Sequence, residues 1–328
     1  MIIMNKKHIN AQLCKVFDEF VSSIENEEVK TAVGQGTIIT GGAIVSLLQG
    51  EKPHDYDMYF KDFETCHKVA DYFIKQFNLG SHNGKIAELK IENADFMERE
   101  KTFEHDGKWI TLDKAKQQVL DSKEPRIKVF ISSEGVAGDM EDDDSYLEDD
   151  EMQTNIEPDT DVENELHEES KYKAKFLTSN AISLSGKVQL VIRFYGDPEK
   201  IHENYDFIHC TNYWTSWDRK VVLNIEALEA IMNKELLYVG SKYPLCSIVR
   251  TRKFINRGWT INAGQYLKMC MQLNDLDLKN VNVLEDQLVG VDSGYFHMLI
   301  DALRSKQNDD PSFQVNNTYV AAIVDKIF

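Results

Sequence analysis

The sequence predicts an α+β fold: a mixed sheet with helices packed on it, large insertions, and a helical C-terminal region. Three observations support this. Residues 188–194 form an apolar β-rich run suited to a central strand. Residues 63–77 carry apolar side chains at helical spacing. From residue 263 to residue 328 the pattern is helical throughout.

Domain organisation follows from length and composition. The chain has 328 residues, of which 42% are hydrophobic, enough for one large or two ordinary domains with their own cores. We expect residues 1–240 to form one domain with insertions and residues 241–328 to form the helical region. A leading helix is expected over residues 9–33, stopped by Gly34 and Gly36 with positive φ.

The net charge of −18 is concentrated in one segment. Residues 134–170 contain 17 Asp and Glu and no Lys or Arg, so the rest of the chain is close to neutral. We expect this segment to be a mobile insertion. It is either a solvated loop or a nucleic-acid mimic that contacts a basic partner or the protein's own substrate channel.

The cysteines and apolar runs indicate the compartment. Five cysteines are odd in number and widely spaced, which is typical of reduced thiols in a cytosolic protein. No run of about 18 apolar residues occurs. We therefore expect a soluble cytoplasmic protein with no membrane association, in the host cytoplasm if the protein is viral.

Residues 41–60 hold the strongest functional pattern. Gly41 and Gly42 let the backbone approach a ligand, and the N–H groups of the helix that follows point at an anion such as a phosphate. Asp55 and Asp57 alternate along a strand, so both lie on one face. Paired carboxylates are costly unless a cation neutralises them, and oxygen ligands suit Mg²⁺ or Mn²⁺ held with substrate phosphates.

This stretch resembles the GG-x-V-R-D-x-L-L-G, spacer, D-x-D signature of the poly(A) polymerase and tRNA nucleotidyltransferase class. That class belongs to the DNA polymerase β-like nucleotidyltransferase superfamily. The match runs from Gly41 to Asp57 without a gap. It departs from the family where Val45 and Ser46 replace Arg-Asp and where His54 replaces Lys.

The resemblance implies a nucleotidyltransferase-type sheet and a metal-dependent enzyme. It would move an NMP from an NTP to a hydroxyl, most simply an RNA or tRNA 3′ end, with the triphosphate near Gly41, Gly42 and Ser46. Two alternatives stay open: a transferase acting on protein or a small molecule, and a catalytically inactive copy with a binding or structural role, for instance in a virus. Residues 183–217 also resemble phage-encoded nucleotidyltransferase-like proteins.

Superfamily members usually add a third carboxylate from a neighbouring strand. Asp206 is the candidate, because residues 205–210 read as a strand that follows a short helix opened by Asp197-Pro198. An N-cap or turn role for Asp206 is the alternative. Gln189 competes for the position: in tRNA-type members the acid lies on a strand ending like residues 191–193, which would leave an amide there.

Basic residues supply the remaining nucleotide-binding candidates. Arg193 ends an apolar strand and is either a phosphate ligand or a partner for a carboxylate. Residues 243–261 resemble the start of the helical neck of tRNA nucleotidyltransferases. Arg250 and Arg252 lie there on a basic helical stretch that either binds triphosphate or RNA backbone or pairs with local acids. His54 and His209 flank the candidate acids, and a lone histidine is more often structural than catalytic.

Overall fold

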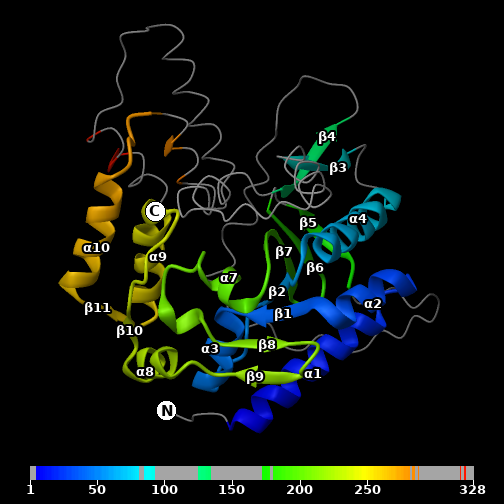
Figure 1. Cartoon of the computed structure of the whole chain (residues 1–328), viewed down its shortest axis with the longest axis horizontal. Coiled ribbons are helices and arrows are strands. Elements are labelled where there is room, and N and C mark those ends of the chain that lie inside the picture. The colour runs from blue at the N-terminus through cyan, green and yellow to red at the C-terminus, as the bar shows by residue number, and fades with distance from the viewer. Residues whose placement is uncertain are drawn as a thin grey trace, which may run out of the picture.

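A computed structural model describes residues 5–80, 85–92, 125–133, 172–177 and 180–280, with a few isolated positions nearer the C-terminus (Figure 1). The sequence predicts a hairpin around Asp106-Gly107 in residues 103–110 and a short helix at residues 114–120. Both segments, like the acidic segment 134–170, lie outside these ranges. The same holds for most of the helical pattern beyond residue 280.

The core of the molecule is a seven-stranded sheet with strand order β5-β6-β7-β2-β1-β8-β9. Strands β2 and β7 pair in parallel and all other neighbours in this sheet pair antiparallel, so the sheet is mixed, as predicted. Its strands are β1 (Thr37–Thr40), β2 (Tyr56–Phe60), β5 (Ala174–Leu177), β6 (Ala181–Leu184), β7 (Val188–Tyr195), β8 (Tyr213–Thr215) and β9 (Lys220–Val222).

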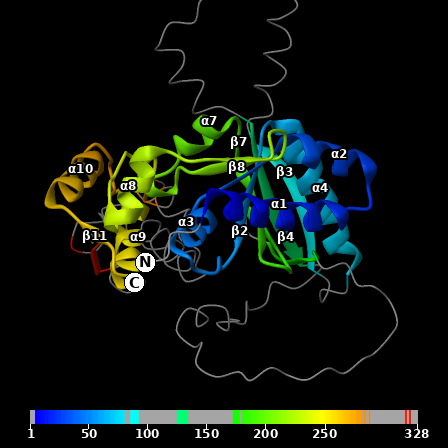
Figure 2. The same ribbon diagram turned by 90° about the horizontal axis from the view of Figure 1, so that it is seen from below.

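Period-two alternation sends the side chains of the central strands to two differently covered faces. Ile39, Met58 and Leu190 belong to the main core, which the sheet shares with helices α1 (Lys6–Ser22), α2 (Glu27–Gly36), α3 (Gly42–Gln49) and α4 (Phe63–Leu79). On the other face, Ile38 and Tyr59 pack with Ile201 of the short helix α7 (Pro198–His202). Figure 2 shows this arrangement from a second direction.

The expected leading helix is two helices. Chain direction changes after Ser22, and the Asn26 side chain caps α2 by accepting from the N–H groups of Glu28 and Val29. The prediction that Gly34 and Gly36 stop the helix with positive φ is wrong. Both lie inside α2, which ends where Thr37 turns extended to begin β1.

Several other predictions for residues 63–204 are confirmed. Helix α4 and strand β7 lie at the expected positions. The β-rich runs 181–184 and 188–194, with Ser185-Gly186 between them, predict a hairpin, and β6 and β7 form it. Gly186 and Lys187 make its turn with φ of 89° and 61°. The β-rich segments β3 (Lys85–Glu92) and β4 (Arg126–Ser133) pair as a separate two-stranded sheet. Strand β7 lies beside β2 in the interior of the main sheet, as a central strand should.

The expected strand at residues 205–210 is absent. Phe207 alone makes an isolated bridge, to Tyr238, and Ile208–Cys210 forms a 3₁₀ turn. Residues of this segment pack against α9 (Pro244–Asn256) at a bend. The Phe207 and His209 rings both contact Phe254.

The C-terminal part is helical over the described residues beyond 240, as predicted. It contains α9 (Pro244–Asn256) and α10 (Ala263–Asn274), which follow α8 (Ile225–Asn233). A two-stranded parallel pair, β10 (Glu235–Leu236) with β11 (Thr260–Ile261), joins the chain before and after α9. None of the helices in the described ranges has the length and apolar character needed to cross a membrane.

Candidate metal and nucleotide site

The site begins at Gly41, between β1 and α3. Its backbone has φ 86° and ψ −144°, a conformation that side chains rarely permit. A Cβ added there would lie 3.5 Å from Asp57 Oδ2 and 3.4 Å from the Tyr205 hydroxyl. Gly41 is the N-cap of α3, and no side chain of the described residues caps the first N–H groups of that helix. The glycine turn therefore brings an uncapped helix N-terminus next to the Asp57 carboxylate.

Asp57 lies half-buried on β2, and exposed Asp55 directly precedes that strand. Burial, together with the negative charge of Asp55, raises the pKa of Asp57 to about 7. No ion pair joins Asp57 to a described residue. Two adjacent carboxylates, one of them half-buried without a counter-charge, are a suitable place for a cation.

Gln189 lies next to Asp57. Strands β2 and β7 run parallel, and the register places Asp57 directly opposite Gln189. In-register residues on neighbouring strands point to the same face of a sheet, about 4.8 Å apart along the hydrogen-bonding direction. The structure thus follows the alternative reading of the sequence, in which an amide takes the place beside the Asp pair.

Asp206 does not join Asp55 and Asp57. Its Oδ2 accepts a 2.7 Å ion-paired hydrogen bond from Nη1 of Arg250 on α9. Asp206 lies in a bend, not a strand, and its carbonyl accepts from the N–H of Val239, which directs the residue toward the C-terminal helices. In the described ranges no three His, Cys, Asp or Glu residues gather closely enough to hold a metal ion.

The three candidate arginines form no ion pair with Asp55 or Asp57 among the described residues. Arg193 is buried and donates to Asn180 Oδ1 and to the Tyr243 hydroxyl, with its guanidinium 5.0 Å from the Tyr243 ring centre. No described carboxylate pairs with it. Arg252 is exposed on α9. Arg250, the third candidate, is the partner of Asp206.

The two histidines that flank the candidate acids in sequence, His54 and His209, lie in different environments. His54 is exposed, whereas His209 is fully buried with its ring 4.8 Å from Phe254 and 4.3 Å from Trp259. Burial lowers the pKa of His209 to about 4, and neither ring nitrogen has a hydrogen-bond partner among the described residues. His209 is therefore a neutral core residue.

Sequence reasoning missed two residues that border the site, Tyr205 and His202. The Tyr205 ring contacts Tyr59 and His202 at centroid distances of 6.2 and 5.1 Å, and its hydroxyl faces Gly41. His202 Nε2 lies 2.8 Å from the Thr40 hydroxyl, and burial lowers its pKa to about 4. No local pattern marks either residue, because only the fold of α7 against the sheet brings them here.

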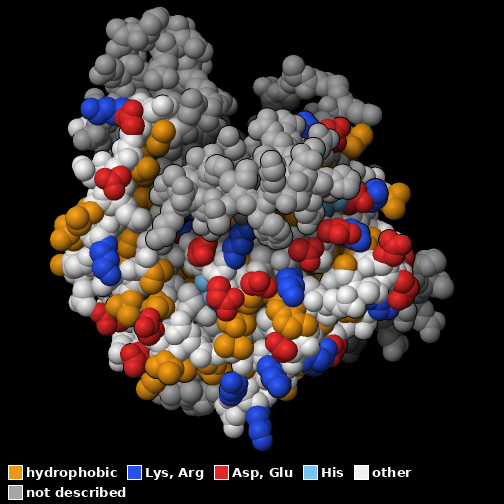
Figure 3. All heavy atoms as spheres, in the orientation of Figure 1, with side chains coloured by type: hydrophobic (Ala, Val, Ile, Leu, Met, Phe, Trp, Pro, Cys, Tyr) orange, Lys and Arg blue, Asp and Glu red, His pale blue; other side chains and the backbone are white. Residues whose placement is uncertain are grey.

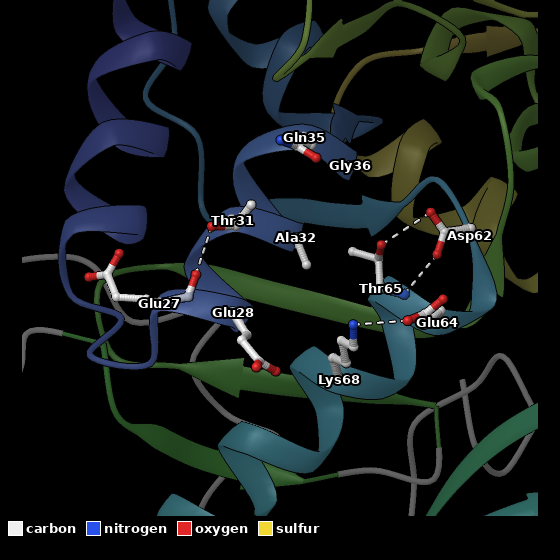
Figure 4. A pocket seen from close by; sticks show the side chains of 10 residues that line it. All are labelled: Glu27, Glu28, Thr31, Ala32, Gln35, Gly36, Asp62, Glu64, Thr65 and Lys68. Carbon is white, nitrogen blue, oxygen red and sulfur yellow. Dashed lines mark hydrogen bonds and ion pairs between the residues drawn. The ribbon is translucent and has the colours of Figure 1, made fainter.

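The described residues line two cavities of notable size. One of about 500 Å³ borders the site, because it is lined by His202 and Tyr205 together with residues 239–242 and Gln272. A larger one of about 800 Å³ lies between α2 and α4 (Figure 4). Its lining includes four acids, and the dashed contacts there are internal, such as Lys68 with Glu64. None of the predicted site residues lines this second cavity.

Fold and site together define an α+β protein in which a paired-aspartate site adjoins a glycine-led helix. The model of the Gabija anti-defense 2 family matches residues 12–234 of this sequence. That is well over half of the chain, so the chain belongs to this family.

Two individual similarities accompany the family match. A protein of Bacillus phage SPbetaL7 named "Gabija anti-defense 2" is 22% identical over 107 residues, which cover 32% of this chain and 27% of that protein. The Thermotoga maritima CCA-adding enzyme complexed with tRNA_CCA superposes with a TM-score of 0.41 and 10% identity, covering 97% of this chain and 58% of that one. A superposition at this level does not by itself define a common fold.

Proposed function

We propose that this protein is a phage counter-defence protein with a metal-dependent nucleotidyltransferase site, which moves an NMP from an NTP to a hydroxyl on an RNA 3′ end. The single observation that carries the proposal is the Asp57 carboxylate beside Gly41 and the uncapped start of α3, with Asp55 adjacent. The family match and the phage relative support the counter-defence role, acting in the host cytoplasm.

The residues fit one divalent cation. Asp55 and Asp57 offer the hard carboxylate oxygens that Mg²⁺ and Mn²⁺ prefer, and a cation would supply the counter-charge that half-buried Asp57 lacks. When bound, the cation would neutralise phosphate oxygens during transfer. Among the residues that the structure describes, no third carboxylate for a second cation converges here.

The other proposed contacts come from the chain's backbone and basic side chains. The first N–H groups of α3, at Gly41 and Gly42, would hold the triphosphate. Ser46, one turn further along the same helix, would add its hydroxyl. This combination positions the phosphates over the Asp pair, which is the main requirement of phosphoryl and nucleotidyl transfer.

The three arginines divide by their contacts. Arg252 is exposed and would contact the RNA backbone, whereas buried Arg193 would contact a phosphate that reaches the start of α9. Arg250 instead holds the segment around Asp206 in place through their ion pair.

Residues 1–240 are the proposed catalytic domain, and residues 241–328 are the proposed helical region.

Incubation with labelled NTPs, total host RNA and Mg²⁺ or Mn²⁺ tests the proposal. Incorporation should occur with the natural chain and be lost in Asp55→Asn and Asp57→Asn. Asp218→Asn, which changes an exposed aspartate in the β8–β9 turn, is the matched control and should retain it. Absence of transfer to RNA, protein or small molecules with either metal contradicts the proposal.

A second candidate is a catalytically inactive protein that binds nucleotide in this site. Gln189 beside Asp57 and the engagement of Asp206 by Arg250 favour it. Equilibrium dialysis with a labelled non-hydrolysable NTP, run beside the transfer assay, separates the candidates. Metal-dependent binding without any transferred product supports the inactive protein, and a screen of protein and small-molecule acceptors covers the remaining alternative.

A further inference from the structure

We infer that the site at Asp55 and Asp57 holds one divalent cation per chain and not two. This inference rests on the proposed function, because it concerns the same carboxylates. It adds a limit on the number of cations. Strand β7 carries Gln189 instead of an acid beside Asp57, and Asp206 in the bend is paired with Arg250, so neither provides the carboxylate that a second cation would need.

The first observation is the row of side chains across three adjacent strands. Asp57 on β2 pairs in register with Gln189 on β7, and Gln189 pairs with Ser183 on β6. All three side chains point to the same face of the sheet. The row therefore contains one carboxylate, one amide and one hydroxyl, and only the carboxylate is negatively charged.

The difference between an amide and a carboxylate decides how many cations can bind. Gln189 offers a neutral carbonyl oxygen and an N–H₂ group that repels a cation. Two divalent cations a few ångströms apart repel each other strongly, and carboxylates on both sides are what offsets this repulsion. Within the described part of the chain only Asp55 and Asp57 supply carboxylates at this site, so the second cation would lack that compensation.

The second observation is the fixed position of Asp206. Its Oδ2 is 2.7 Å from Arg250 Nη1, and its carbonyl accepts from the Val239 N–H at 3.0 Å. The next residue, Phe207, is held by its bridge to Tyr238. Moving the Asp206 carboxylate to the Asp pair would break the ion pair and leave the guanidinium without its partner.

Counting bound Mn²⁺ by electron paramagnetic resonance tests the inference on the full chain, with a non-hydrolysable NTP analogue present. The acidic segment 134–170 will add weak sites, so only those lost in the double variant Asp55→Asn/Asp57→Asn are counted. In the natural chain, the double substitution should remove one bound Mn²⁺ per chain. In the Gln189→Glu variant, the same double substitution should remove two, because the new side chain places a carboxylate next to Asp57.

Ser183→Glu is the matched control, because it adds the same charge one strand further away and should still lose one Mn²⁺ per chain. Two sites lost from the natural chain would overturn the inference and leave the proposed function standing. No site lost would overturn both. If Gln189→Glu folds and the double substitution still removes only one Mn²⁺ from it, the amide does not limit the site, and the inference is also overturned. If Gln189→Glu does not fold, the Mn²⁺ count on the natural chain decides.

Discussion

At the scale of single residues, Gly41 is the position where sequence and structure agree most closely. The glycine pair followed by a helical pattern predicted a close backbone approach, and the structure shows why the first glycine is needed. Its φ of 86° is a conformation that side chains rarely adopt, and a Cβ there would be in van der Waals contact with the Asp57 carboxylate and the Tyr205 hydroxyl. Gly42 has neither restriction.

Gly41→Ala should therefore destabilise the protein by about 1–3 kcal/mol, the usual cost of a strained backbone conformation. It should also weaken binding of an NTP analogue, because a change of backbone conformation at residue 41 would displace the start of α3. Gly42→Ala is the control: nothing lies within 4 Å of its added Cβ, so its free energy of unfolding should stay near that of the natural chain. Urea denaturation of both variants is the measurement. Equal stabilities would contradict the role given to Gly41.

His209 gives a second residue-scale prediction, on pH. Burial lowers its pKa to about 4 in the folded protein, against 6.5 for a free histidine, so the unfolded chain binds the extra proton between these values. Stability from this residue is complete above pH 6.5 and is lost as the pH falls toward 4. At about 1.4 kcal/mol per pH unit, the loss is on the order of 2–3 kcal/mol.

His209→Phe should remove that part of the pH dependence. The site is lined by aromatic rings and offers no hydrogen-bond partner to either nitrogen, so a phenyl ring should be tolerated. Urea denaturation at pH 7 and pH 4.5 should show a smaller difference in the variant than in the natural chain. His202 titrates in the same direction and remains in both proteins, so it does not affect the comparison. An unchanged difference would contradict the neutral buried state of His209.

At the scale of elements, local patterns predicted most strands and helices because their apolar spacing matches their final burial. Helix α4 and strands β6 and β7 are examples. The segment 205–210 was mispredicted as a strand for the opposite reason. Phe207 is the one buried apolar residue of this segment. It packs with Tyr238 and Phe254 at a bend, and these tertiary contacts are not encoded in a local pattern.

The link between that bend and α9 is the Asp206–Arg250 ion pair. Arg250→Met should leave the buried Asp206 carboxylate without a partner. Because the Arg250 side chain is 40% exposed, the expected loss of stability is below that for a fully buried pair, about 2 kcal/mol. Arg252→Met changes an exposed neighbour on the same helix and should cost little. Thermal unfolding of the two variants makes the comparison, and equal midpoints would contradict a structural role for the pair.

At the scale of the whole molecule, the order of the strands was the part that the sequence could not supply. The parallel pairing of β2 with β7 joins residues separated by more than a third of the chain, and only this pairing decides between Gln189 and Asp206 as the neighbour of Asp57. Motif spacing predicted the Asp pair and the glycine turn because both lie within one short stretch. The third position depends on topology, which short-range patterns do not encode.

Charge is also distributed at this scale. On the face shown in Figure 3, acidic and basic side chains of the described residues are interspersed, in keeping with the near-neutral charge expected outside residues 134–170. The acidic segment itself lies outside the described residues, and both of its proposed roles stay predictions. Deleting it and measuring RNA binding distinguishes them, because a mimic that occupies the substrate channel would weaken RNA binding in the natural chain.

The most direct test of the central claim is a crystal structure of the full chain with a non-hydrolysable NTP analogue and Mn²⁺, with the cation located by anomalous scattering. The expected result is one Mn²⁺ held by Asp55 and Asp57, with the phosphates against Gly41, Gly42 and the start of α3. A nucleotide bound elsewhere, or a structure at saturating Mn²⁺ and nucleotide with no cation between the two carboxylates, would contradict it.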